Sequence, residues 1–142
     1  QLLDFGGQEQ YRDVLNVFMS DGGIVLVCFS IPKILLEEHS HSEEADSEMG
    51  TLRFWLSSVF AHAPTTPVIL AATHCDQYDA EELREVVCPK LDTILEQVLG
   101  LVPGIGMQLV PNAEDKLSFF PIDNTRTKFP KTVDILRDAM DQ

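Results

Sequence analysis

The sequence predicts an α/β fold in which helices cover a mostly parallel β-sheet. Residues 23–31 form a continuous apolar run rich in β-branched side chains, which is typical of a strand buried on both faces. Residues 67–72 form a second apolar run, and it leads into polar residues. Segments with apolar residues at helical spacing lie between and after these runs. The alternation favours a single α/β unit without internal repeats.

The composition fits one globular domain and narrows the choice of partners. The 142 residues are 44% hydrophobic and 23% charged, so the chain can bury a core and needs no second domain. With 10 basic and 23 acidic residues the formal charge is −13, which disfavours binding to nucleic acid or to an anionic membrane. The three cysteines form no C-x-x-C pair, and no apolar run is as long as a membrane span. We therefore expect a cytoplasmic protein without disulfides or direct membrane insertion.

The first helix is predicted over residues 10–19, which carry an apolar stripe at helical spacing. A Ser-Asp-Gly-Gly run ends this helix. Residues 23–31 then form a core strand of the sheet and not an edge strand, with Cys28 as a small buried apolar side chain. The inward residues of the helix are Tyr11, Val14, Leu15 and Phe18.

An acidic segment at residues 37–49 interrupts the pattern of strands and helices. It contains several acids and no Lys or Arg, which predicts a solvated surface loop inserted into the fold. His39 and His41 lie among these acids, so a metal site is the alternative interpretation. A helix resumes at Thr51 and ends near Ala63. The acids are Glu37, Glu38, Glu43, Glu44, Asp46 and Glu48.

A long helix is predicted after the second strand. Asp79 begins a capping-box pattern, and the apolar stripe that follows continues to Gly100. Pro89 interrupts this stripe, so the helix must bend or begin again there, because an interior proline removes a backbone hydrogen bond. Residues 100–116 are rich in turn formers, which predicts a second surface insertion.

The chain closes with a strand and a helix. Residues 117–125 predict a short strand that ends in polar residues. Residues 131–140 predict the last helix, with Val133, Leu136 and Met140 facing inward.

The most chemically distinctive stretch is residues 2–11, where a strand end meets two glycines and an amide. The Asp4 carboxylate, at the carboxyl end of the strand, can reach a hydrated Mg²⁺ ion. Gly7 lacks a Cβ and lets a backbone N–H approach a terminal phosphate. Gln8 has an amide that both donates and accepts, as the positioning of an attacking water requires. A simple Gly-Gly turn between a strand and a helix is the alternative interpretation.

Polar residues also follow the two later strands. Thr73, His74 and Asp76 come after the apolar run 67–72. A carboxylate at Asp76 can accept two hydrogen bonds from one ligand. A polar loop between a strand and a helix is the alternative. The residues that end the strand 117–125 are Asp123, Asn124 and Thr125.

These stretches resemble the nucleotide motifs of one family. Asp4-Phe5-Gly6-Gly7-Gln8 resembles the D-x-x-G-Q switch motif of Ras-like GTPases, and the run as far as Tyr11 is most similar to Roc (Ras of complex proteins) domains of Roco proteins. Thr73-His74-Cys75-Asp76 resembles the N-K-x-D guanine motif, with Thr in place of Asn. Asp123-Asn124-Thr125 stand where the family has its last guanine-contacting loop. The departure is His74, which replaces a lysine whose stem packs over the base.

The resemblance covers essentially the whole chain and implies a Ras-like P-loop NTPase fold with three layers that binds GTP or GDP with Mg²⁺. It implies that Asp4 holds the metal through water, that Gly7 contacts the γ-phosphate and that Gln8 orients the water. The residues implied around the base are Thr73, His74, Asp76, Asp123, Asn124 and Thr125.

The amino-terminal phosphate-binding segment of such a domain is absent from this sequence, which contains no G-x-x-x-x-G-K-[ST] run and no Gly-Lys pair. The resemblance therefore implies that residues 1–142 are a single partial Roc domain, its carboxyl two-thirds. It also places the missing first strand beside residues 23–31, which leaves unpaired backbone groups. We expect the isolated chain to be poorly stable and inactive alone, and the complete parent domain to hydrolyse GTP.

Two functions remain open at this point. The first is a guanine-nucleotide switch in a larger Roco-type signalling protein, which implies a neighbouring COR domain, repeats or a kinase in the same chain, and dimerisation. The second is a non-catalytic, GTPase-like scaffold that binds other proteins.

Overall fold

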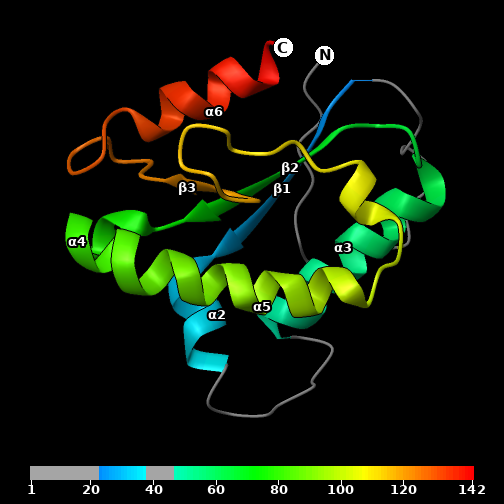
Figure 1. Ribbon diagram of the computed structural model, residues 1–142, viewed down its shortest axis with the longest axis horizontal. Coiled ribbons are helices and arrows are strands. Elements are labelled where there is room, and N and C mark those ends of the chain that lie inside the picture. The colour runs from blue at the N-terminus through cyan, green and yellow to red at the C-terminus, as the bar shows by residue number, and fades with distance from the viewer. Residues whose placement is uncertain (1–22, 38–46) are drawn as a thin grey trace.

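The computed structural model describes residues 23–37 and 47–142. Three strands, β1 (Val25–Ser30), β2 (Val68–Thr73) and β3 (Phe120–Ile122), form a parallel sheet in the order β1-β2-β3 (Figure 1). Val25 pairs with Val68 at one end of the first ladder, and Thr73 pairs with Ile122 in the second. The described residues thus confirm the predicted α/β class with a parallel sheet.

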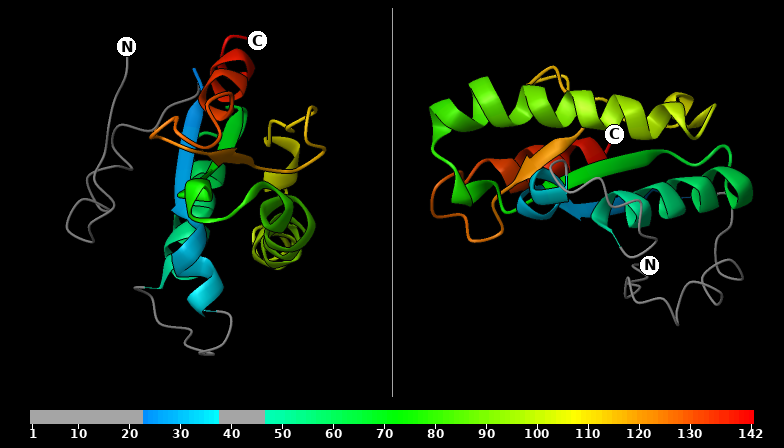
Figure 2. Two further views of the ribbon diagram at one scale, coloured as in Figure 1. Left: turned by 90° about the vertical axis from the view of Figure 1, so that its left-hand side faces the viewer. Right: turned by 90° about the horizontal axis from the view of Figure 1, so that it is seen from below.

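Helices cover the sheet on two sides. On one face, α2 (Ile31–Glu37), α3 (Glu48–His62) and α5 (Cys88–Gly100) share a core with the inward residues of β1 and β2. On the other face, α6 (Thr132–Met140) packs over residues of β2 and β3. Figure 1 shows α5 and α6 on opposite sides of the strands, and the right-hand view of Figure 2, seen from below, shows α6 behind the strands.

One face of β1 is exposed, which corrects a prediction. Val27 and Phe29 are buried, but Leu26 is 40% exposed and Cys28 is exposed as well. Among the described residues, only β2 pairs with β1. The prediction of a core strand buried on both faces, with Cys28 inside, is therefore wrong for this part of the chain. The physical reason is that α6 packs over β2 and β3 and not over β1.

The ends of the predicted acidic loop are helical. Glu37 is the last residue of α2, and its carboxylate accepts hydrogen bonds from the first N–H groups of α3, including that of Met49 at 3.1 Å. Ser47 caps the same helix through the Gly50 N–H at 3.0 Å. Glu48 accepts from the Ser30 N–H at 2.8 Å. These residues are held as helix caps because carboxylates satisfy unpaired N–H groups at helix starts. Residues 38–46 lie outside the described part.

The long helix passes its proline through a π-helical turn, since Glu82, Val87 and Cys88 all keep helical dihedrals. Asp79 caps α4 (Ala80–Glu82) by accepting from the Glu82 N–H at 2.8 Å. A π-helical segment, η2 (Leu83–Val87), follows, and α5 then starts with Pro89 in its first turn. The wide turn of η2 accommodates the proline.

The second predicted insertion is partly buried, which also corrects a prediction. Ile105, in the 3₁₀ turn η3 (Ile105–Met107), and Asn112 are almost fully buried. The buried Gln108 side chain donates to the backbone carbonyls of Ala63 and Thr66, at 2.8 Å each. This segment also pairs with the start of β2, since the Val110 N–H donates to the Val68 carbonyl. Backbone pairing and buried amides therefore hold it in the fold.

The final helix lies close to its predicted position. Val133 and Leu136 of α6 pack against the core of β2 and β3, as predicted. Met140 is 37% exposed, so its predicted inward position is wrong. Ile135 and Ala139 pack inward instead. Within the residues that the structure describes, no helix is both long and apolar enough to span a bilayer.

Candidate functional site

The carboxyl ends of the three strands meet at one edge of the sheet, because the strands are parallel (Figure 1). Two polar loops leave this edge from neighbouring strands. The loop after β2 contains His74 and Asp76, and the loop after β3 begins at Asp123. Ligands of open α/β sheets bind at this edge. The site predicted from the sequence therefore has its two described loops side by side.

The loop after β2 makes a sharp turn. The Thr73 hydroxyl donates to the Phe29 carbonyl at 3.1 Å and ties the end of β2 to β1. His74 follows in a left-handed conformation with φ 67° and ψ 29°, and its side chain is exposed. Few residues other than glycine adopt this conformation without strain, and here it redirects the chain into the 3₁₀ turn η1 (Cys75–Gln77). Asp76 lies in that turn.

The Asp76 carboxylate is available to a ligand. The residue is partly exposed, and among the described residues no hydrogen bond or ion pair involves its carboxylate. Beside it, Cys75 is fully buried, and burial together with the carboxylates of Asp123 and Asp76 raises the pKa of its thiol to about 12. Cys75 is therefore a neutral side chain that feels the charge of both carboxylates.

Asp123 organises the second loop. Its buried carboxylate accepts hydrogen bonds from the N–H and the hydroxyl of Thr125 through one oxygen. The other oxygen accepts from the N–H groups of Lys128 at 2.9 Å and Phe129 at 2.8 Å. The Asp123 N–H donates to the Thr132 hydroxyl at 3.0 Å, which ties the loop to the start of α6. One carboxylate thus fixes the whole segment from the end of β3 to α6.

These contacts determine the charge and the role of Asp123. Burial alone raises a carboxyl pKa, but the four hydrogen bonds hold the pKa of Asp123 well below its usual range. The carboxylate is therefore ionised, and its lone pairs are occupied within its own loop. Asn124 is exposed, and neither its backbone N–H nor its side chain makes a hydrogen bond within the described part of the chain. A ligand would meet Asn124 before Asp123.

The structure brings together six of the predicted site residues on two adjacent loops. The other three, Asp4, Gly7 and Gln8, lie outside the described residues. His39 and His41, the alternative metal ligands, lie outside them too. Within residues 23–37 and 47–142, no group of three or more His, Cys, Asp or Glu side chains is arranged to hold a metal ion. The residues brought together are Thr73, His74, Asp76, Asp123, Asn124 and Thr125.

Three residues that hold the second loop in place were not predicted from the sequence. Lys128 and Phe129 contribute only backbone N–H groups, which any residue type would supply. Thr132 accepts from the Asp123 N–H and donates to the Phe129 carbonyl at 2.8 Å. The Asp-x-Thr spacing of residues 123–125 indicates only the bond from Asp123 to the Thr125 N–H, because Asp side chains often bond the N–H two residues on.

Comparison with known proteins gives distant relatives. No family model matches the chain, and no solved structure matches it. The chain is 32% identical over 76 residues to leucine-rich repeat serine/threonine-protein kinase 1 of Caenorhabditis elegans. The matched segment covers 54% of this chain and 3% of that protein. It is 29% identical over 97 residues to probable serine/threonine-protein kinase roco6 of Dictyostelium discoideum, which covers 68% of this chain and 4% of that protein.

A second kind of relative is smaller. The chain is 27% identical over 81 residues to GTP-binding protein rho3 of Schizosaccharomyces pombe, which covers 57% of this chain and 34% of that protein. The matched segment thus spans about a third of this relative and a few per cent of the two kinases. The chain is distantly related to Roco-type kinases and to Rho-type GTPases.

Proposed function

We propose that this chain is part of a guanine-nucleotide-binding domain of the Roc type, within the Ras-like P-loop NTPase fold. The observation that carries the proposal is the partly exposed Asp76 carboxylate, which has no partner among the described residues and lies beside a loop held rigidly by Asp123. Relatives named as Roco kinases and as a GTP-binding protein support the same assignment.

The two loops suit a guanine base. Guanine presents a ring N–H and an amine side by side, and the two oxygens of the Asp76 carboxylate can accept from both. Adenine offers no such pair, so the site discriminates between the purines. The backbone N–H of Asn124 is the donor available for the carbonyl oxygen of guanine. The fit therefore rests on an acceptor from one loop and a donor from the other.

The remaining predicted base residues take supporting roles in this proposal. Asp123 is a positioning residue, because its carboxylate is already saturated by its own loop. Thr73 fixes the end of β2 through its bond to Phe29, and Thr125 closes the loop on Asp123. His74 is exposed, so its imidazole can lie against the face of the base, where the family has a lysine stem.

The phosphate end of the site remains a proposal from the sequence. Asp4 would hold Mg²⁺ through water, Gly7 would contact the γ-phosphate of GTP, and Gln8 would orient the attacking water. The cradle for the other phosphates would come from a G-x-x-x-x-G-K-[ST] loop outside these 142 residues. GTP and GDP would then be distinguished by the order of residues 4–11. A COR domain, repeats or a kinase in the same protein, and dimerisation, belong to this proposal.

Nucleotide binding by the full-length protein tests the proposal. Isothermal titration calorimetry with GDP, GTP, ADP and ATP should show binding of the guanine nucleotides alone. Asp76→Ala should abolish that binding, and Asp138→Ala, which removes an exposed acid of α6, should leave it unchanged. A folded protein that binds no guanine nucleotide would contradict the proposal and support a scaffold function.

A further inference from the structure

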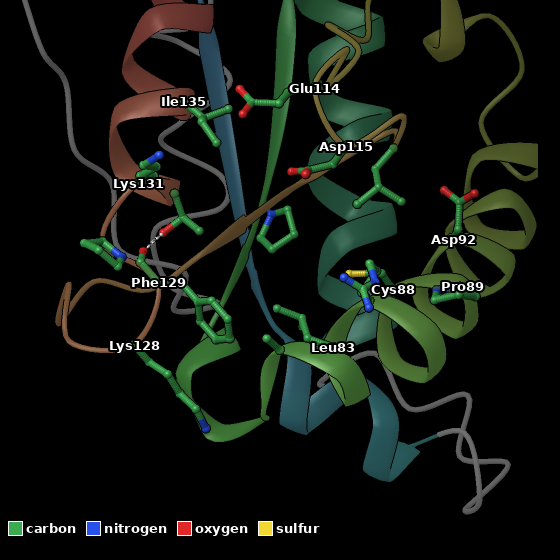
Figure 3. A pocket seen from close by; sticks show the side chains of 16 residues that line it. Leu83, Cys88, Pro89, Asp92, Glu114, Asp115, Lys128, Phe129, Lys131 and Ile135 are labelled. Atoms are coloured by element: carbon green, nitrogen blue, oxygen red, sulfur yellow. Dashed lines mark hydrogen bonds between the residues drawn. The ribbon is translucent and has the colours of Figure 1, made fainter.

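A groove lies beside β3, between the first turns of α5 and the start of α6 (Figure 3). Its volume is about 790 Å³, which is in the range of sites that hold ligands or side chains of a partner. Within the described residues β3 is the outer strand of the sheet on this side, and Pro121 has no N–H to offer to an added strand. The groove is therefore suited to side chains and not to strand addition.

The floor of the groove is apolar. Leu83 and Cys88 contribute from η2 and α5, Phe129 from the loop after β3, and Ile135 from α6. Burial and the nearby carboxylates of Asp115 and Asp92 raise the pKa of the Cys88 thiol to about 11. The thiol is thus neutral at pH 7 and behaves as an apolar group. A large apolar side chain would bury its surface on this floor.

One side of the groove is acidic. Asp92, Glu114 and Asp115 line it, and Figure 3 shows the carboxylates of Glu114 and Asp115 extending from their loop toward α6. Asp92 accepts from the Ser118 hydroxyl at 3.1 Å, and Asp115 accepts from the Asn112 amide at 2.9 Å. In the described part of the chain no Lys or Arg forms an ion pair with any of the three acids.

Three cations line the rim of the same groove. Arg84 forms an ion pair with Glu85 at 3.5 Å. Lys128 and Lys131 are exposed, and in Figure 3 the Lys128 side chain extends away from Leu83 and Cys88. The groove therefore combines an apolar floor with an acidic side whose carboxylates form no ion pair among the described residues, while the exposed Lys128 and Lys131 also line its rim.

We propose that this groove binds a short basic, apolar segment of a partner protein. A large apolar side chain of the partner occupies the floor, and flanking Lys or Arg side chains pair with Glu114 and its acidic neighbours. The charge of −13 repels a second copy of this chain and acidic peptides, and it attracts basic ones. The proposal needs no bound nucleotide and is independent of the proposed function.

Fluorescence anisotropy with the full-length protein and three labelled peptides tests this proposal. The first peptide has a central Trp-Leu pair flanked by lysines. The second replaces the lysines with glutamates, and the third replaces the Trp-Leu pair with serines. The first peptide should bind, and its affinity should fall as salt is added, because ion pairs at an exposed rim are screened. The other two should bind more weakly.

A matched pair of variants assigns the binding to the groove. Glu114→Lys should weaken binding of the first peptide by about fivefold, because it replaces an attraction with a repulsion at an exposed position. Glu96→Lys changes the net charge equally at an exposed position of α5 that does not line the groove, and it should have a much smaller effect. Both variants change exposed side chains, so both should fold.

Three results would overturn the proposal. They are no binding of the first peptide, equal binding of the glutamate or serine peptide, and equal losses in Glu114→Lys and Glu96→Lys. A photoreactive group on the first peptide should crosslink to residues 83–92 or 129–135. Crosslinks confined to other surfaces would also contradict the proposal.

Discussion

Replacing Asp76 with asparagine tests base recognition separately from folding. The change keeps the size of the side chain, and no contact among the described residues depends on the Asp76 carboxylate. Guanine would lose one charged hydrogen bond, and the second would become neutral. Hydrogen bonds to charged groups contribute about 1.5–3 kcal/mol each, so the loss should be about 2–4 kcal/mol. This corresponds to a GDP affinity about 30- to 1000-fold weaker.

The assay is calorimetric titration of GDP into the full-length protein, with thermal unfolding of the nucleotide-free form as the control. The free energy of unfolding should change by less than about 0.5 kcal/mol, as expected for a surface substitution. Xanthosine diphosphate adds a second readout, because xanthine has a carbonyl where guanine has its amine and can accept from the new amide. Unchanged GDP affinity in Asp76→Asn, or no gain for xanthosine diphosphate over GDP, would refute the assignment of this carboxylate to the base.

Three further predictions concern buried polar groups and thiols. The fold lowers the pKa of Asp123, so this carboxylate stabilises the folded state above its unfolded pKa of about 4, and the stabilisation is lost as the pH falls further. Asp123→Asn should therefore make the free energy of unfolding less dependent on acid pH. Urea unfolding at several pH values from 7 to 3 measures this. Gln108→Leu removes the amide that donates to the carbonyl groups of Ala63 and Thr66 and should cost about 1–3 kcal/mol in chemical denaturation; a cost within error of zero would refute the buried contacts. Iodoacetamide at pH 8 should modify the exposed Cys28 before Cys75 and Cys88, because the buried thiols of Cys75 and Cys88 have pKa values of about 12 and about 11. Mass spectrometry measures the three rates, and modification of Cys75 or Cys88 as fast as Cys28 would contradict this prediction.

The strands and helices could be predicted because their signals are local. The apolar runs gave β1 and β2, the Asp79 cap gave the start of α4, and Pro89 indicated the irregular turn before α5. Burial was harder to predict because it depends on which element packs over a strand. The exposed face of β1, which includes Cys28, could not be predicted, because an apolar run does not indicate which of its faces is covered. The buried positions of Ile105 and Asn112 likewise depend on distant contacts of a turn-rich segment.

The sequence predicted which residue types lie at the candidate site, but it predicted their roles less well. The spacing after β2 identified Asp76 as an acceptor, and the described structure leaves that carboxylate without a partner. Asp123 was assigned to the base with Asn124, but its carboxylate is engaged by the N–H groups of Lys128 and Phe129. A sequence pattern reports that a carboxylate is present and does not report which donors reach it first.

The most direct test of the central claim is hydrogen–deuterium exchange of the full-length protein with and without GDP. If the loops after β2 and β3 hold a guanine base, GDP should slow exchange in residues 73–79 and 123–129 together, and ADP should leave both segments unchanged. Slower exchange in these segments with ADP as well, or bound GDP that protects neither of them, would contradict the account.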